Sequence, residues 1–126
     1  MTEITRSDVE SWVQRYVRAW NSNEPDDIAV LFTDDAIYLT SPFDAPWKGR
    51  EEIVAGWLQI KDEPGDTTFA FEVIAIDRDL AVVEGRTTYK EPATRYGNVW
   101  LIRLAHHGRC ASFTEYWMEG SSKADR

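Results

Sequence analysis

The chain has 126 residues, 43% of them hydrophobic, and a formal net charge of -8 from 22 acidic and 14 basic side chains. This size and composition predict a single globular domain over residues 1–126, and the acidic balance without Lys/Arg clusters argues against a nucleic-acid or anionic-membrane partner. Cys110 is the only cysteine, which excludes a disulfide framework, and no apolar run approaches membrane-spanning length, so we expect a cytoplasmic protein.

Three helices are predicted in the first half of the chain. Ser7 and Glu10 match a capping box, and apolar residues recur at helical spacing over Val9–Trp20. Proline suits the first turn of a helix, so a short second helix is predicted over Pro25–Phe32. A third helix is predicted over Arg50–Ile60.

Strand-like residues dominate the rest of the chain. The predicted strands are Ile37–Thr40, Thr67–Ile76, Leu80–Tyr89, Arg95–Ala105 and Arg109–Glu119. Short connections with turn residues join the last four, which predicts an antiparallel meander. Helices followed by such a meander indicate an α+β domain with helices packed on one face of a sheet.

The strand predicted over Arg95–Ala105 has two largely apolar faces. One face carries Tyr96, Asn98, Trp100, Ile102 and Leu104, and the other carries Gly97, Val99, Leu101, Arg103 and Ala105. Because the helices cover only one face of the sheet, we expect the outer face to meet a second copy of the chain in a homodimer.

The last strand places a carboxylate among aromatic side chains. With a period of two residues, Glu115 lies on the same face as Phe113 and Trp117. If this face is buried, the charge must be paired, hydrogen-bonded or neutralised by a raised pKa. A general acid or base is one interpretation. A structural ion pair and a solvent-facing Glu115 are the alternatives.

The chain resembles a known superfamily in three segments. Val13–Val17, Ala29–Ala36 and Lys48–Ile53 are similar to the first helix, the second helix and the third-helix entry of the nuclear-transport-factor-2-like superfamily. This superfamily includes ketosteroid isomerase, limonene epoxide hydrolase, scytalone dehydratase and the SnoaL-like polyketide cyclases. The resemblance implies a cone-shaped fold in which three N-terminal helices and a curved, mainly antiparallel sheet enclose a cavity. The six Trp, five Tyr and five Phe suit a cavity wall or a large interface.

Comparison with ketosteroid isomerases assigns two hydrogen-bond donors. Tyr16 is similar to the tyrosine that donates to the oxyanion, and Asn98 falls near the protonated aspartate that is the second donor. The catalytic base of those enzymes is an aspartate before a proline, whereas here Ser41 precedes Pro42. A serine cannot carry that proton, so steroid isomerisation of that type is not expected.

Comparison with limonene epoxide hydrolase assigns other positions. Tyr38 resembles the tyrosine of its water-holding pair, and Thr40 replaces the asparagine of that pair. Arg86 resembles its central arginine, Thr88 replaces the first catalytic aspartate, and Glu115 stands where the second would be. Epoxide opening in this chain would need a substitute carboxylate.

Both comparisons imply one orientation of the strand over Leu80–Tyr89. They place Val82, Glu84, Arg86 and Thr88 inside, although composition leaves the face open, because Ala81, Val83, Gly85 and Tyr89 are equally apolar. With the implied orientation, Glu84 supplies a substitute carboxylate, and Arg86 holds one of two carboxylates ionised while Glu115 acts as general acid or base. The alternative is a purely structural role, in which Glu84, Arg86 and Glu115 form ion pairs that only rigidify the sheet.

The resemblance implies an enzyme that needs no cofactor. We expect general acid–base chemistry (isomerisation, cyclisation, dehydration or epoxide opening) on a small apolar carbonyl or epoxide compound. Tyr16 and Asn98 would donate hydrogen bonds to a developing oxyanion. The expected ligand-contacting residues are Trp20, Tyr38, Thr40, Trp57, Thr88, Trp100, Phe113 and Trp117. A ligand-binding domain without catalysis and a dimeric interaction module are the alternatives.

No metal site is expected. His106 and His107 precede Gly108 at a predicted hairpin tip, and no further residues supply ligand spacing.

Overall fold

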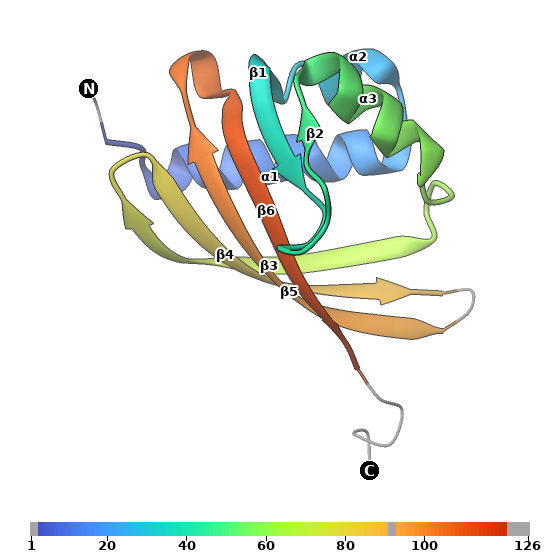
Figure 1. Cartoon of the computed structure of the whole chain (residues 1–126). Coiled ribbons are helices and arrows are strands. Elements are labelled where there is room, and N and C mark those ends of the chain that lie inside the picture. Colours follow the sequence, from blue (N-terminus) through green and yellow to red (C-terminus); the bar gives the residue numbers. More distant parts are fainter. Residues whose placement is uncertain (1–2, 91–92, 121–126) are drawn as a thin grey trace.

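The structure is a computed structural model that describes residues 3–90 and 93–120, and it contains three α-helices and a six-stranded sheet (Figure 1). The strands are β1 (Phe32–Leu39), β2 (Trp47–Lys48), β3 (Thr67–Asp77), β4 (Leu80–Tyr89), β5 (Thr94–Leu104) and β6 (Cys110–Glu119). They follow the order β2-β1-β6-β5-β4-β3, with β1 and β6 parallel and the other neighbours antiparallel. The predicted α+β class is confirmed. The structure adds β2, which was not predicted, and β1 begins at Phe32 rather than Ile37.

Helix α1 (Arg6–Ser22) crosses the concave face of the sheet (Figure 1). Its capping box is not the predicted one: the Thr5 side chain accepts from the Asp8 amide at 3.1 Å, and Asp8 Oδ2 accepts from the Thr5 amide at 2.9 Å. Thr5 takes the extended conformation that an N-cap requires, so Ser7 lies inside the helix. The predicted apolar stripe is buried at Val9, Trp12, Val13, Tyr16 and Ala19.

Two shorter helices complete the helical layer. Helix α2 (Pro25–Ala29) starts at the predicted proline and ends before Phe32, because Phe32 already pairs in β1. Helix α3 (Arg50–Gln59) matches the prediction and buries Ile53 and Trp57. None of the helices in the two described ranges is both long and apolar enough to cross a membrane.

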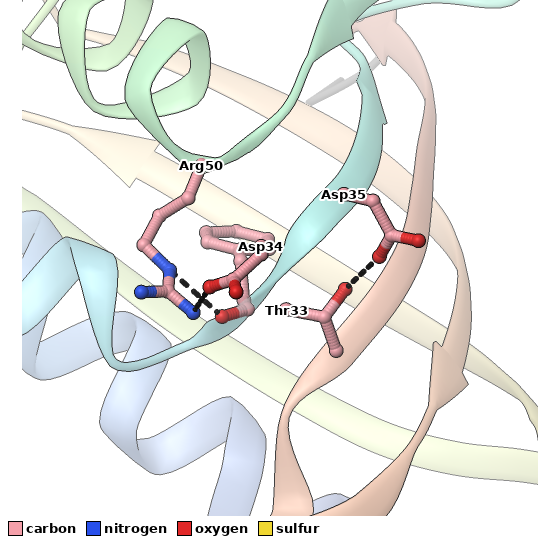
Figure 2. A network of polar contacts seen from close by, with 5 residues as sticks. Thr33, Asp34, Asp35 and Arg50 are labelled. Carbon is pink, nitrogen blue, oxygen red and sulfur yellow. Dashed lines mark hydrogen bonds and ion pairs between the residues drawn. The ribbon is translucent and has the colours of Figure 1, made fainter.

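Polar contacts fasten the start of α3 to β1 (Figure 2). Arg50 forms an ion pair with Asp34, and its Nε donates to the Phe32 carbonyl at 3.3 Å. On the same strand, the Thr33 hydroxyl donates to Asp35 at 3.0 Å. The two Arg50 contacts therefore join the first residue of α3 to β1, whereas the Thr33–Asp35 bond stays within the strand.

Strand register decides which side chains of β4 face the helices. Val83 of β4 lies opposite Trp100 of β5, and Trp100 lies opposite Glu115 of β6. Opposite residues project from the same face of a sheet, so the odd-numbered residues of β4 point inward. The exposure of the β4 side chains supports this orientation. The buried residues are Ala81, Val83, Gly85 and Thr87, and the exposed ones are Glu84, Arg86 and Thr88.

The interior placement of Glu84, Arg86 and Thr88 is therefore wrong, and Val82 shares their outer face. A shift of register by one residue moves every side chain of a strand to the opposite face. Composition did not exclude either face of β4, and the pairing with β5 selects the alternative one.

Candidate functional site

A cavity of about 300 Å³ opens between α1, α3 and the inner face of the sheet. Its lining is Tyr16, Trp20, Tyr38, Thr40, Trp47, Trp57, Ile60, Lys61, Asp62, Thr87, Tyr89, Tyr96, Asn98, Glu115 and Trp117. Aromatic rings form most of the wall, which suits the apolar part of a small ligand.

Eight residues singled out from the sequence meet in this cavity. They are Tyr16, Trp20, Tyr38, Thr40, Trp57, Asn98, Glu115 and Trp117. Two others lie behind the wall: Trp100 and Phe113 are buried, with ring centroids 4.6 and 5.5 Å from that of Tyr16. Glu84, Arg86 and Thr88 lie on the opposite face of the sheet.

Three polar side chains form a chain across the floor of the cavity. The Thr87 hydroxyl donates to Asn98 Oδ1 at 2.8 Å, and Asn98 Nδ2 donates to Glu115 Oε2 at 2.6 Å. The predicted interior group of Glu84, Arg86 and Glu115 does not form among the described residues, because Glu84 and Arg86 are on the outer face. Asn98, a neutral donor, thus orients the Glu115 carboxylate.

The environment of Glu115 favours its protonated form. Burial raises the pKa of this carboxyl above its ordinary value, while the N–H groups of Trp100 and Asn98 act in the opposite direction. The Trp100 indole N–H is buried and has no hydrogen-bond partner of normal geometry among the described residues, although it lies close enough to stabilise the carboxylate charge. Among the described residues, Glu115 is thus a carboxylate in an aromatic surrounding that accepts a side-chain hydrogen bond from the neutral amide of Asn98.

Two tyrosines share a hydrogen bond beside this carboxylate. The hydroxyls of Tyr16 and Tyr38 are 2.7 Å apart and buried. Burial, and then the negative charges of neighbouring groups including Glu115, raise the pKa of both phenols well above the ordinary value. Both therefore stay protonated, and because the pair uses one hydroxyl proton, the other is free to donate.

Aromatic packing holds this pair rigidly. The Phe113 ring stacks on Tyr38 at 4.6 Å and lies nearly parallel to Tyr16 at 5.5 Å. Trp47 of β2 stacks on the other side of Tyr38 at 5.0 Å. The hydroxyl pair is therefore preorganised rather than mobile.

A second carboxylate lies in the cavity lining, and the sequence analysis missed it. Asp62 follows α3 in a turn and accepts hydrogen bonds from Trp20 Nε1 at 2.7 Å and the Tyr89 hydroxyl at 3.0 Å. Sequence pattern offers no signal for this position, because a charged residue in a turn usually faces solvent. Thr87 and Tyr96 were also missed, although period-two alternation with Tyr89 and Asn98 could have found them.

Other reactive side chains lie outside the cavity. His106 and His107 are exposed in a 3-10 turn. Cys110 is fully buried, and burial raises the pKa of its thiol to about 12, so it is a poor nucleophile. Within residues 3–90 and 93–120, no group of three or more His, Cys, Asp or Glu side chains is arranged to hold a metal ion.

Comparison with known proteins identifies relatives by family and by fold. A family model described as a SnoaL-like domain matches residues 13–113. No curated protein matches the chain. Three solved structures are similar to it: an NTF2-like protein of unknown function from Mesorhizobium loti, a ketosteroid isomerase-like protein from Erwinia carotovora atroseptica, and a protein of unknown function with a cystatin-like fold from Methylobium petroleophilum PM1.

These structures share the fold at low sequence identity. The M. loti protein has a TM-score of 0.69 at 19% identity, over 94% of this chain and 97% of that one. The Erwinia protein has a TM-score of 0.68 at 20% identity, over 91% and 97% of the two chains. The Methylobium protein has a TM-score of 0.72 at 12% identity, over 96% and 82%. At such identities the comparison establishes the fold alone.

Proposed function

The chain belongs to the SnoaL-like domain family within the NTF2-like superfamily, and on this premise we propose that it is a cofactor-independent enzyme acting on a small carbonyl compound. The observation that carries the proposal is the position of Glu115, a carboxylate in an aromatic cavity beside the hydrogen-bonded hydroxyls of Tyr16 and Tyr38. Family membership alone would not select a reaction.

The proposed reaction is proton transfer next to a carbonyl group. Glu115 removes a proton from the carbon beside the carbonyl, and a tyrosine hydroxyl donates a hydrogen bond to the enolate oxygen that develops. In a substrate with a β,γ double bond, protonated Glu115 then delivers a proton to the γ carbon, which moves the double bond next to the carbonyl and completes an isomerisation. Exchange of the Glu115 proton with solvent before this step brings deuterium from D2O onto carbon. The raised pKa of Glu115 brings the carboxyl closer to neutral pH, where a general base works best.

Epoxide opening fits the cavity less well. The hydrolase arrangement needs an arginine between two interior acids, whereas Arg86 and Glu84 lie on the outer face. Among the residues that the structure describes, Lys61 is the one basic side chain in the cavity lining, and it is exposed. Enolate formation requires only one base and one neutral hydrogen-bond donor. In the proposal, Glu115 is the base and the tyrosine pair is the donor.

The test is exchange of carbon-bound protons in D2O, followed by proton NMR over a panel of small cyclic ketones. We expect the wild type to accelerate exchange for some members, and Glu115→Gln to slow it by at least about 100-fold. Glu72→Gln is the matched control, because Glu72 is an exposed strand glutamate on the outer face. Ligand binding without exchange would favour the alternative, a non-catalytic binding domain.

We propose in addition that two copies associate through the outer face of the sheet. Val99, Tyr116 and Met118 are 38%, 44% and 74% exposed there, and Glu84 and Arg86 add opposite charges that suit a two-fold contact. Light scattering should report a dimer that Val99→Asp dissociates. Phe43→Asp is the control, since Phe43 is 98% exposed in the loop between β1 and β2 and is not one of the outer-face strand residues. A monomeric wild type would contradict the proposal.

A further inference from the structure

The carboxylate of Asp62 is held in a fixed position in the cavity lining. Its Oδ2 atom accepts both the Trp20 indole N–H at 2.7 Å and the Tyr89 hydroxyl at 3.0 Å. No hydrogen bond to its Oδ1 atom comes from any residue that the structure describes. One oxygen of a preorganised carboxylate is therefore available to a ligand.

The turn that carries Asp62 is fastened at several points. Asn23 Nδ2 donates to the Asp62 carbonyl at 2.9 Å, and Asn21 Oδ1 accepts from the Gly65 amide at 3.2 Å. The Lys90 amide donates to the Asp66 carbonyl at 3.0 Å, which joins the turn to the end of β4. Because both sides of the turn are held, the carboxylate keeps its place without a ligand.

Four aromatic rings share the cavity lining with this carboxylate: Trp20, Tyr89, Tyr96 and Trp117. The Tyr96 ring meets Tyr89 at 5.7 Å and Trp117 at 5.9 Å, both in edge-to-face geometry. Trp117 is 55% exposed, which places these rings where the cavity opens to solvent. Aromatic faces carry partial negative charge and attract cations.

The ionisable groups of the lining also favour a cation. In the described part of the lining, Asp62 and Glu115 are acidic and Lys61 is the one basic group. The Lys61 side chain is exposed, and no ion pair joins it to Asp62 in the described part of the chain. An anionic ligand would approach two carboxylates, whereas an organic cation would find a carboxylate oxygen and several ring faces.

We propose that the entrance of the cavity, formed by Asp62 with Trp20, Tyr89, Tyr96 and Trp117, binds an organic ammonium group of the substrate. This inference rests on the proposed function, because it names the substrate class of the same cavity: a carbonyl compound that also carries an amine. The ammonium group lies at Asp62 and the carbonyl end enters toward Glu115.

The test compares two ligands of equal size that differ in charge, 3-phenylpropylammonium and 3-phenylpropan-1-ol, by isothermal titration at neutral pH. We expect the ammonium to bind the wild type on the order of tenfold more tightly, which corresponds to about 1.4 kcal/mol. Asp62→Asn should abolish this preference, while its side-chain oxygen still accepts from Trp20 and Tyr89. Glu63→Gln is the matched control, because it removes one negative charge from an exposed neighbour and should keep the preference.

A third variant separates this inference from the proposed function. Glu115→Gln should keep the ammonium preference, because the cation lies at Asp62, even though it stops proton exchange. Loss of the preference in Glu115→Gln, equal losses in Asp62→Asn and Glu63→Gln, or equal binding of the two ligands to the wild type would each overturn the ammonium site. Failure of the proton-exchange test with the preference at Asp62 intact would overturn the enzymatic proposal instead.

Discussion

Asn98 and Glu115 lie on neighbouring strands, and the Asn98 amide donates a 2.6 Å hydrogen bond to the Glu115 carboxylate. The Thr87 hydroxyl in turn donates to the side-chain oxygen Oδ1 of Asn98. This bond orients the side-chain amide so that its N–H points toward Glu115. The protonation state of Glu115 therefore depends on a neutral hydrogen-bond donor rather than on a basic side chain.

Replacing Asn98 by leucine should raise the pKa of Glu115 further. The change removes a donor that favours the charged form and keeps a side chain of similar volume, so burial dominates. Carbon-13 NMR titration of the Glu115 carboxyl measures the shift. Thr87→Val should act in the same direction but more weakly, because it only releases the orientation of Asn98. An unchanged or lowered pKa in Asn98→Leu would contradict the assigned contact.

Glu115→Gln should be more stable than the wild type at neutral pH. The folded-state pKa of Glu115 is raised above its ordinary value of 4.5, so between that value and the folded pKa the native state binds more protons than the unfolded state. Wild-type stability therefore falls, relative to the variant, as pH rises through this window, and the difference then stays constant. Thermal melts from pH 4 to pH 8 measure it, with Glu72→Gln as the control. A variant that is less stable at every pH would mean that the carboxylate stabilises the fold.

The hydroxyls of Tyr16 and Tyr38 should be energetically coupled. Either single substitution by phenylalanine leaves a buried hydroxyl without its partner and should cost about 1–3 kcal/mol. The double variant should cost less than the sum of the two, because no unpaired hydroxyl then remains. Urea unfolding of the four proteins measures the coupling, and additive losses would argue against the hydrogen bond.

Gly85→Ala tests the orientation of β4. A methyl group at this position would collide with the Phe69 ring, which stacks on Trp100 at 4.7 Å, so we expect a loss of about 1–3 kcal/mol. Gly97→Ala is the matched control: Gly97 is a strand glycine on the outer face, and its added methyl group would meet no heavy atom within 4 Å. Thermal melts distinguish the two, and equal stabilities would contradict the orientation.

Arg86→Gln should leave the pKa of Glu115 unchanged. Arg86 is exposed on the outer face, so the sheet separates its guanidinium from the cavity. The same carbon-13 titration checks this expectation. A raised pKa in Arg86→Gln would mean that the arginine supports the carboxylate after all.

Local sequence pattern predicted the elements well where one rule dominated. The stripe from Val9 to Trp20 matches a single helical face, and Pro25 begins α2 as its restricted backbone favours. Short-range pattern failed for β2, because two residues are too few to display alternation and this strand exists only through its pairing with Tyr38 and Ile37.

The residues of the candidate site fall into the same two groups, those that sequence comparison can name and those that depend on tertiary contacts. Tyr16 and Glu115 could be named because a helical stripe and a period-two alternation place them among apolar residues. Asn98 was named from the family resemblance, because both faces of its strand are largely apolar. Asp62 could not be named, because its place in the cavity depends on contacts with Trp20 and Tyr89, which are distant in the chain.

The sequence by itself determined the helices, most of the strands and the placement of an acid on one strand face with Phe113 and Trp117, since these depend on periodicity and composition within a few residues. Only the tertiary structure decided which face of β4 turns inward, because composition left the face open and the family resemblance favoured the face that carries Glu84 and Arg86. Val83 pairs with Trp100 and therefore points inward, so its neighbours on the chain point outward, as does Arg86. The hydrogen-bond partner of Glu115 is then Asn98. The physical reason is that strand register is a property of two strands, and one residue of shift reverses every side chain.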